Sequence, residues 1–561
     1  MKTVETYDYY SDWLVDYLLN NGVDGFVFNP GASFRGLHDS LVAKEMEDGE
    51  SYIHMVAHEE IAVATAHGYR KATGRNLCVV LHANVGLLHA SMALFNAWSD
   101  RIPLLVLVGN GPLNAAERRP WIEAVHTSYD VLSPVREFAA MTSAQTDQWG
   151  TSQAVKRALT ALTNDLLDGP ALITLDSAVQ EENFAPGGVA SAASTIYTNL
   201  IGSELCAQQI AKQVCKARRP LLLLERSGRL DGIGEVLKEF TAATFGHLPI
   251  VELGFYENNF AGELGATFHR IEDLAIHDTA PDLIVAIMVS DVIGHLGTVF
   301  DRTQLKRATL VSVEDRFPRL KSWSEDATLE NPGRMIVTDV AAFLTELAFQ
   351  LRQVGMSGVD WLKTTVRQGT QVDTVVDAVL CVAAEYGKFV VVNGGSNTID
   401  LAIRRSGQLN NSDQYLGMNG GAGLGYGLPA SFGAALAVSR WQDAVTPIAF
   451  IGDGDFLYTP SALLTIAEEH IPVLLVVVNN RQYKNSVDHA ARIAEYRDRT
   501  TDIFRATSFY DSVVDFVQMA ASFGISGCRT SVKDRNLDHS IRSALTQVDE
   551  GHPFLLEVQI D

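Results

Sequence analysis

Short apolar runs recur along the chain, and most of them end at glycine, proline or a small polar residue. In the first third these runs are GFVFNPG, NLCVVLHAN, PLLVLVGNG and PALITLD, with helix-like stretches such as YYSDWLVDYLLNNG among them. Continuous apolar runs that alternate with helices are typical of strands buried on both faces of a parallel sheet. The pattern therefore predicts an α/β fold.

The same alternation returns twice further along the chain. The second block contains RPLLLLERSG, LPIVELG, DLIVAIMVS and ATLVSVED, and the third contains KFVVVNGGSN, TPIAFIGDGD, IPVLLVVVNN and PFLLEVQID. The stretches APGGVASAAST (185–195) and RQVGMSGVD (352–360) mark the joins between blocks. We therefore predict three doubly wound parallel-sheet domains, at residues 1–185, 196–350 and 360–561.

Composition narrows the class of protein. A hydrophobic content of 47% and a charged content of 20% fit a globular protein, and no apolar run approaches the roughly 18 residues of a membrane span. The net charge of −23 argues against nucleic acid or an anionic membrane as a partner. The five cysteines are scattered, and the N-terminus lacks an apolar signal-peptide core. We therefore expect a cytoplasmic protein without a disulfide framework.

Two neighbouring strands of the third block end in small oxygen-bearing residues. In FIGDGDFLYTPSALLTIAEEHIPVLLVVVNN, Asp453 follows one strand, a helix is predicted from near Thr459, and Asn480 follows the next strand, 27 residues after Asp453. The two ends lie side by side in a right-handed βαβ unit. Carboxylate and amide oxygens suit Mg²⁺, which completes its octahedron with phosphate oxygens. Gly-Asp-Gly alone is also ordinary turn sequence, but the pair at this spacing favours a Mg²⁺-diphosphate site.

This unit resembles the cofactor-anchoring motif of the thiamine diphosphate-dependent enzymes, in which Gly-Asp-Gly precedes Asn-Asn by under thirty residues. The resemblance implies three ligands for Mg²⁺: Asp453, the side chain of Asn480 and the main-chain carbonyl of Gln482. It also implies diphosphate contacts from two loops, at Gly454, Asp455 and Phe456 and, in VVVNGGSNT, at Gly395, Ser396 and Asn397.

Three more stretches extend the resemblance over nearly the whole chain. MNGGAGLGYGLPASFGAALA (418–437) matches the family's Gly-rich segment, which implies that Leu424 bends the cofactor and that the backbones of Ala422 and Leu424 bond its aminopyrimidine. In AHEEIAVATAHGYRKATG (57–74), Glu59 precedes Gly68 by nine residues. Glu59, and not Glu60, therefore matches the glutamate that binds N1′ of the pyrimidine and promotes loss of the C2 proton.

The third stretch, VVLHANVGLLHASMALFNAWSDRIPLLVLVGNGP (79–112), resembles the next strand and helix of the same domain. The order of motifs is that of the family: pyrimidine-binding, middle and diphosphate-binding domains. The resemblance implies a homodimer or homotetramer with active sites between subunits.

In motif detail the chain is closest to the benzoylformate decarboxylase branch, alongside acetolactate synthase and pyruvate decarboxylase. His82 lies 23 residues after Glu59, where that branch has a catalytic histidine, although an ordinary histidine at a strand end is the alternative. His295 lies close to the place of a second, middle-domain histidine. The substrate pocket departs from the branch at three positions: Ala32 replaces a serine, with Ser33 adjacent, and Asn485 and His489 replace apolar residues.

We therefore expect non-oxidative decarboxylation of a small-molecule 2-oxo acid, dependent on thiamine diphosphate and Mg²⁺, through a C2 ylid and an enamine. Two alternatives remain open: a carboligase like acetolactate synthase, and a non-catalytic cofactor-binding subunit. FAD is not expected, because residues 196–350 carry no clear FAD signature.

Overall fold

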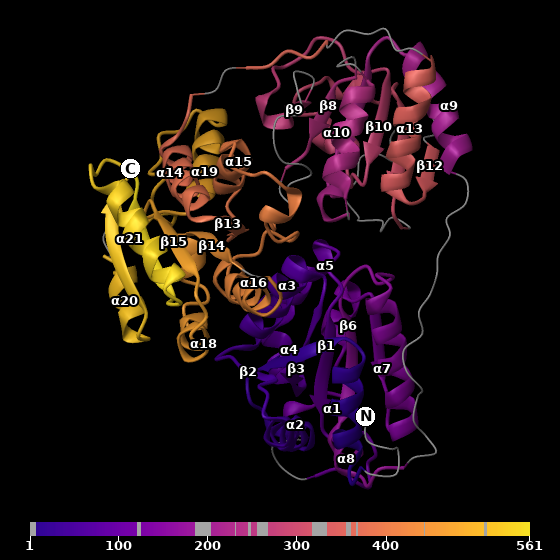
Figure 1. Cartoon of the computed structure of the whole chain (residues 1–561), viewed down its shortest axis with the longest axis vertical. Coiled ribbons are helices and arrows are strands. Elements are labelled where there is room, and N and C mark those ends of the chain that lie inside the picture. Colours follow the sequence, from indigo (N-terminus) through magenta and orange to yellow (C-terminus); the bar gives the residue numbers. More distant parts are fainter. Residues whose placement is uncertain are drawn as a thin grey trace. The chain divides into compact units, whose positions relative to one another are not determined.

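The computed structural model describes residues 7–119, 125–185, 203–230, 232–244, 248–254, 268–316, 334–354, 361–365, 368–442, 444–509 and 513–561. Within these ranges the strands form three sheets in which every pairing is parallel, and helices pack against them (Figure 1). The predicted fold class, three parallel-sheet α/β domains, is confirmed. The predicted domain boundaries stay a prediction, and most of the two predicted joins lies outside the described residues.

The first sheet has the strand order β2-β1-β3-β4-β6-β5. Its strands are β1 (Val23–Phe28), β2 (Ile53–Met55), β3 (Asn76–His82), β4 (Leu105–Asn110), β5 (Met141–Ala144) and β6 (Ala171–Asp176). The helices of this part of the chain are α1 (Tyr10–Asn20), α2 (Arg35–Asp48), α3 (Glu59–Thr73), α4 (Ala83–His89), α5 (Ser91–Ser99), α7 (Gln148–Thr163) and α8 (Ser177–Glu181), with 3₁₀ turns η2 (Ala32–Phe34) and η3 (Ser133–Phe138). The strands β3, β4 and β6 are buried almost throughout, as their continuous apolar runs predict.

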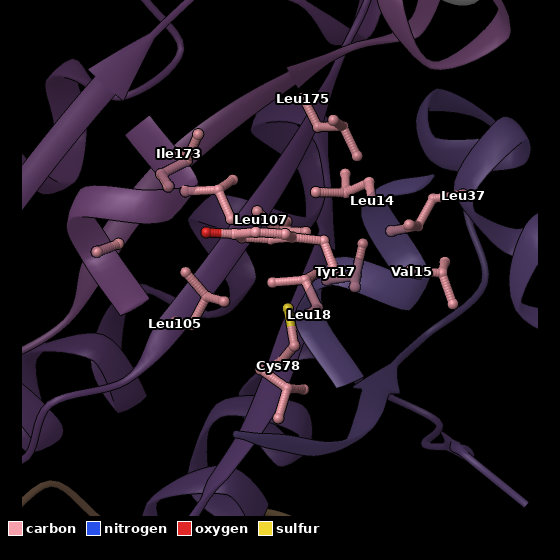
Figure 2. Packing of buried hydrophobic residues seen from close by; sticks show 14 of the residues in the cluster. Leu14, Val15, Tyr17, Leu18, Leu37, Cys78, Leu105, Leu107, Ile173 and Leu175 are labelled. Atoms are coloured by element: carbon pink, nitrogen blue, oxygen red, sulfur yellow. The ribbon is translucent and has the colours of Figure 1, made fainter. Parts of the chain in front are cut away.

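One face of this sheet packs against α1 and α2 (Figure 2). Leu105 and Leu107 of β4 and Ile173 and Leu175 of β6 are spaced by two residues, so they point to the same face. The thiol of Cys78 lies fully buried in this core, and burial raises its pKa well above the usual range. Cys78 therefore serves as a small apolar side chain.

The second sheet has the order β12-β11-β10-β7-β8-β9. Its strands are β7 (Pro220–Leu224), β8 (Ile250–Glu252), β9 (Phe268–Arg270), β10 (Leu283–Ile287), β11 (Thr309–Glu314) and β12 (Arg334–Val337). The accompanying helices are α9 (Ser203–Lys216), α10 (Ile233–Ala243), α11 (Val292–Leu296), α12 (Arg302–Leu305) and α13 (Val340–Val354), with 3₁₀ turns η5 (Ser227–Arg229) and η6 (Ile271–Asp273). Two buried hydrophobic clusters, built on alternate residues of β7 and β10, form its core.

The third sheet has the order β13-β14-β15-β17-β16. Its strands are β13 (Lys388–Asn393), β14 (Val445–Gly452), β15 (Leu474–Asn479), β16 (Ser526–Ser531) and β17 (Phe554–Gln559). The helices in this part of the sequence are α14 (Gln371–Tyr386), α15 (Asn397–Arg405), α16 (Gly427–Trp441), α17 (Asp453–Phe456), α18 (Ala462–Glu468), α19 (Lys484–Tyr496), α20 (Phe516–Ser522) and α21 (Leu537–Asp549), with the 3₁₀ turn η8 (Ser412–Gln414). A helix was predicted from near Thr459, and α18 begins at Ala462, whose amide donates to the Thr459 carbonyl at 3.0 Å. The short helix α17, which begins directly at Asp453, was not predicted.

The chain divides into two compact units, the first at residues 1–196, 378–399 and 418–561 and the second at 197–377 and 400–417. In the first unit α3 packs along α16, and Thr65 donates a hydrogen bond to the carbonyl of Pro429 at 3.3 Å. A methyl group on Gly68 would lie 2.8 Å from the Cα of Ala430, so only glycine permits this approach. The chain's first and third sheets thus belong to one packed body. Across the described residues, no helix has both the length and the apolarity needed to cross a membrane.

Candidate active site

The two oxygen-bearing strand ends meet, as predicted. Gly452 of β14 pairs with Val478 of β15, so Asp453 and Asn480 follow adjacent strands at the same edge of the sheet. One carboxylate oxygen of Asp453 accepts from the Gly454 amide at 2.8 Å, and the other accepts from the Arg481 amide at 2.5 Å. The Asn480 side-chain oxygen accepts from the Gln482 amide at 3.0 Å. Asp453 therefore bridges the two strand ends.

The residues at this edge fit a hard cation. Asp453 is 2% exposed, and burial raises the pKa of its carboxyl to about 6 despite the amides of Gly454 and Arg481, which lower it. The side-chain oxygen of Gln482 is buried and has no hydrogen-bond partner among the described residues. A cation here would favour the charged carboxylate. No cluster of three or more His, Cys, Asp or Glu residues with metal-binding geometry occurs in the described ranges. A Mg²⁺ ion that takes amide and carbonyl oxygens does not need one.

Three loops converge beside this edge. A methyl group on Gly394 would lie 2.5 Å from a carboxylate oxygen of Asp455, and one on Gly427 would lie 2.8 Å from the same oxygen. The Gly425 amide donates to the other oxygen of Asp455 at 2.7 Å. The loop after β13, the Gly-rich loop before α16 and the turn after β14 thus meet around one buried carboxyl group. The sequence predicted two of these loops, the one after β13 and the turn after β14, near the diphosphate, and the Gly-rich loop at the aminopyrimidine.

Burial raises the pKa of Asp455 to about 7; the amides of Gly425 and Gly427 lower it, and the charge of Glu60 raises it further. Burial likewise raises the pKa of Glu60 to about 7. Glu60 lies 3.1 Å from a methyl group placed on Gly425. Glu60 therefore belongs to this site, although no sequence motif assigned it a role.

The remaining residues that were predicted to contact the diphosphate differ in whether their backbone or their side chain is available to it. Gly395 has a φ of 102°, and the amides of Gly395 and Ser396 each donate to the side-chain oxygen of Asn393 at 3.3 Å. Asn397 begins α15 and is exposed. The ring of Phe456 is fully buried against Phe516, with ring centroids 5.3 Å apart. Phe456 can therefore offer only its backbone to a phosphate.

Tyr483 closes the turn at Gly454. A methyl group on Gly454 would lie 2.5 Å from the ring of Tyr483, so the glycine lets this ring pack against the backbone. The ring of Tyr483 also contacts Phe509, with centroids 5.8 Å apart.

The Gly-rich loop that carries Ala422 and Leu424 is held by two asparagines. The Gly423 amide donates to the side-chain oxygens of Asn96 and Asn419 at 3.1 and 3.2 Å, and both side chains donate back to its carbonyl. Ala422 has a φ of 52° and is exposed, and Leu424 is partly exposed. The buried Asn96 comes from α5, so the first third of the chain fixes a loop of the last third. No motif had marked Asn96.

Glu59 begins α3 and is 6% exposed. The side chain of Asn29 donates to its carboxylate at 3.2 Å, and a methyl group on Gly86 would lie 3.1 Å from its side chain. His58 caps the helix by accepting from the Glu60 amide at 3.2 Å. The loop after β1 and the start of α4 thus enclose Glu59.

His82 stands at the carboxyl end of β3, as predicted, and both of its ring nitrogens are engaged. Nδ1 lies 2.8 Å from the hydroxyl of Ser33 and 3.4 Å from the Ser33 amide. Nε2 lies 2.9 Å from Nδ1 of His126. His126 follows His82 by 44 residues and belongs to no motif, so the sequence alone did not indicate that the two rings meet.

The other predicted residues are scattered. Ala32 is exposed next to the buried Ser33. Asn485 and His489 are exposed on α19, in the first unit. His295 lies in the second unit, where its ring is 3.3 Å from the buried Glu225. Burial alone would lower the pKa of His295, but the hydrogen bond and charge of Glu225 outweigh it, and the pKa is raised. The roles of all these site residues stay predictions.

Two family models match this chain, and together they cover just over half of it. Residues 9–132 match the thiamine pyrophosphate enzyme N-terminal TPP binding domain, and residues 395–558 match the C-terminal TPP binding domain. The chain belongs to the thiamine pyrophosphate enzyme family, as its motifs predicted.

Similar proteins span the whole chain at low identity. Acetolactate synthase 2, chloroplastic, from Brassica napus is 23% identical over 98% of this chain and 85% of its own length. The acetolactate synthase large subunit of Lactococcus lactis is 22% identical over 98% of this chain and 92% of its own. The thiamine diphosphate-dependent 4-hydroxybenzoylformate decarboxylase of Rhodococcus jostii RHA1 has a TM-score of 0.76 and 21% identity over 99% of both chains. The benzoylformate decarboxylase of Polynucleobacter necessarius has a TM-score of 0.77 and 18% identity over 99% and 98%. The structural likenesses establish the fold.

Proposed function

We propose that this protein is a thiamine diphosphate- and Mg²⁺-dependent enzyme that decarboxylates a 2-oxo acid without oxidation. The observation that supports this most is the imidazole of His82 at the carboxyl end of β3, held between Ser33 and His126. Asn29, which donates to Glu59, and Ser33 belong to the same loop. The loop that contacts the predicted catalytic glutamate therefore also contacts an imidazole that can donate or accept a proton.

Different residues of the chain bind the metal, bind the diphosphate and transfer protons. Asp453, Asn480 and Gln482 hold Mg²⁺, and the loops at 394–396, 425–427 and 453–455 hold the diphosphate. Thiamine diphosphate, when bound, supplies a nucleophilic carbon and a sink for the electrons of the broken bond. Glu59 holds a proton at the pyrimidine, inside an enclosure that keeps it from bulk water. The imidazoles return a proton to the carbon that loses CO₂.

Carboligation is the second candidate. This candidate is supported by the acetolactate synthases, which match 98% of this chain in sequence at 22–23% identity. In that reaction a second carbonyl compound, and not a proton, is taken up by the carbon that loses CO₂. The two reactions share every residue of the cofactor site, so the products decide between them.

The test is CO₂ release and product identity over aliphatic, aromatic and acidic 2-oxo acids, with thiamine diphosphate and Mg²⁺ present. A Glu59→Gln variant and a surface control, Glu550→Gln, run beside the wild-type protein. CO₂ with an aldehyde, lost in Glu59→Gln and kept in Glu550→Gln, is the expected result. CO₂ with hydroxyketones as main products would establish the carboligase instead. Cofactor binding without any turnover over the panel would refute 2-oxo acid decarboxylation.

We also infer the oligomeric state, the cellular compartment and the flavin content of the enzyme. A homodimer or homotetramer with active sites between subunits follows from family resemblance, and light scattering of the holoprotein tests it. The five cysteines are unpaired, which fits a reducing cytoplasm. We expect no bound flavin, so the purified protein should not absorb near 450 nm.

A further inference from the structure

His82 cannot itself present a proton to a substrate, because both of its ring nitrogens are occupied. The backbone N–H of Ser33 can only donate, and it points at Nδ1 of His82 at 3.4 Å. Nδ1 is therefore the accepting nitrogen of the neutral ring, and the proton sits on Nε2. Nε2 then donates to Nδ1 of His126 at 2.9 Å. Because Nδ1 of His126 accepts this hydrogen bond, the neutral ring of His126 carries its own proton on Nε2.

Nε2 of His126 has no hydrogen-bond partner within the described part of the chain. His126 is partly exposed, and its neighbours are tied to the strand ends. The Ser128 amide donates to the side chain of Asn84 at 2.6 Å, and the Gly111 amide donates to Thr127 at 3.3 Å. Since Asn84 follows His82 and Gly111 follows β4, the imidazole of His126 is held over the carboxyl edge of the first sheet.

We propose that His126 is the residue that hands the proton to the product carbon, that His82 supplies it through the hydrogen bond between the two rings, and that Ser33 is a positioning residue. This assignment rests on the proposed decarboxylation and deepens it. It replaces the simpler expectation that His82 acts alone.

The proton balance closes within these three residues. A solvent proton makes the imidazole pair cationic, with His82 donating through Nε2 to His126 and through Nδ1 to the Ser33 hydroxyl. When the bond to the carboxylate breaks and CO₂ leaves, its electron pair stays with the carbon. The Nε2–H bond of His126 then breaks as the new C–H bond forms, while the Nε2 proton of His82 moves to Nδ1 of His126. Two neutral rings remain, with the proton of His82 now on Nδ1. Nε2 of His126 takes the next proton from solvent, and the Nδ1 proton of His126 then returns to Nε2 of His82, which restores the cationic pair.

The Ser33 hydroxyl can pair with Nδ1 of His82 whether that nitrogen accepts or donates a proton, because a hydroxyl can do either. Its position is fixed by contacts on two sides: its carbonyl accepts from the side chain of Gln180 at 2.9 Å, and a methyl group on Gly109 would lie 2.5 Å from its hydroxyl. Ser33 is 2% exposed, so water does not readily replace its hydroxyl. A side chain without a hydroxyl would leave Nδ1 of His82 with only the long backbone contact.

The kinetic test uses the holoenzyme with thiamine diphosphate, Mg²⁺ and the 2-oxo acid it turns over best. His126→Gln is compared with Ser33→Ala, Ser33→Thr and the exposed control His552→Gln. Aldehyde formation should fall about 10²- to 10⁴-fold in His126→Gln, less in Ser33→Ala, and recover in Ser33→Thr. Ferricyanide removes the need for the proton, because two equivalents take one electron each from the carbon that has lost CO₂, and water then completes the carboxylic acid. CO₂ release with ferricyanide should therefore stay within about twofold of wild type.

Equal losses with and without ferricyanide in His126→Gln, or no loss of aldehyde formation, would overturn the assignment. A second measurement needs no substrate: ¹⁵N NMR of the histidine side chains in the holoenzyme. The expected spectrum has His82 protonated at Nε2, and Ser33→Ala shifts it towards a mixture of tautomers while His552→Gln leaves it unchanged. If wild type decarboxylates nothing, the proposed function fails, and this spectrum still decides whether the chain of hydrogen bonds exists.

Discussion

Asp453 and Asp455 stand two residues apart at the end of β14, and burial raises the pKa of both carboxyl groups, to about 6 and about 7. Asp453 faces the amides of the neighbouring strand end, where a cation would stabilise its charge. Asp455 faces the Gly-rich loop and Glu60, and no positively charged side chain of the described residues is hydrogen-bonded to it. The first is therefore suited to a metal, and the second is suited to accept amide hydrogen bonds that fix the loop.

Replacing Asp455 by asparagine should stabilise the cofactor-free protein at high pH. The native carboxyl has a pKa of about 7, whereas an unperturbed aspartate has a pKa of about 3.9, so the folded protein binds a proton that the unfolded chain has already lost. Between these two values the wild-type protein loses stability as pH rises, and the penalty is constant above about pH 7. Asp455→Asn removes the charge and keeps an acceptor for the Gly425 amide. We expect a gain of about 1–3 kcal/mol at pH 8 that vanishes near pH 4.

Urea unfolding of the cofactor-free protein at several pH values measures this difference. The exposed Asp549→Asn, whose carboxyl group lies at the end of α21, is the matched control and should show no trend with pH. A gain for Asp455→Asn that is the same at every pH would contradict the assignment.

At the residue scale the sequence predicted the position of His82 but not its partner. Glu59, His82 and Asp453 each stand at a fixed spacing within a motif, which is why sequence alone located them. His126, Asn96 and Glu60 enter the site only through folding, which carries other segments to the same sheet edge. A lone histidine in VHTSYD gives no spacing that could reveal such a contact.

At the element scale, α3 is both a packing helix and the support of Glu59. A methyl group on Gly68 would lie 2.8 Å from the carbonyl carbon of Ala430 in α16. Gly68→Ala should therefore cost about 1–3 kcal/mol of stability through overpacking and weaken cofactor binding by moving Glu59. Gly234→Ala in α10 is the control, because nothing lies within 4 Å of its added methyl group and alanine favours a helix.

Chemical denaturation and calorimetric titration with thiamine diphosphate and Mg²⁺ check both variants. Equal stability of Gly68→Ala and wild type would contradict the close approach of α3 and α16. The glycine spacing of both helices was visible in the sequence, but which two glycine-bearing helices meet depends on the tertiary fold.

Strands were the elements that sequence predicted best, because burial on both faces leaves continuous apolar runs such as LLVVV of β15. The short helix α17, directly after β14, was not predicted. Gly452 already has extended backbone angles and Asp453 begins α17, so the helical turn starts within the Gly-Asp-Gly sequence itself. Glycine at two of these three positions obscured that signal.

At the scale of the whole molecule, residues 400–417 belong with the middle sheet although they follow β13 of the third sheet in sequence. A buried ion cluster within this second unit explains why. The guanidinium of Arg404 is fully buried and lies 2.9 Å from Asp400, 2.9 Å from Glu272 and 3.4 Å from Glu252. Sequence could not indicate this, because the three carboxylates come from separate segments.

Arg404→Met should leave Glu252 and Asp400 buried without their counter-charge and cost about 3–5 kcal/mol. The exposed Arg542, which pairs with Glu385 and Asp538, supplies the control, and Arg542→Met should cost far less than Arg404→Met because water screens an exposed pair. Urea unfolding followed by far-ultraviolet circular dichroism measures both. A cost for Arg404→Met as small as that of the control would contradict a role for the cluster in holding residues 400–417.

The central claim is that this chain activates thiamine diphosphate through Glu59, and one measurement tests it without knowledge of the substrate. Hydrogen–deuterium exchange at C2 of the bound cofactor is followed by NMR in wild type, Glu59→Gln and Glu550→Gln, with Mg²⁺ present. We expect exchange much faster than in free cofactor for wild type and Glu550→Gln. In Glu59→Gln we expect exchange about 10²- to 10⁴-fold slower than in wild type. Exchange in the wild-type protein no faster than in free cofactor, or unaffected by Glu59→Gln, would contradict it.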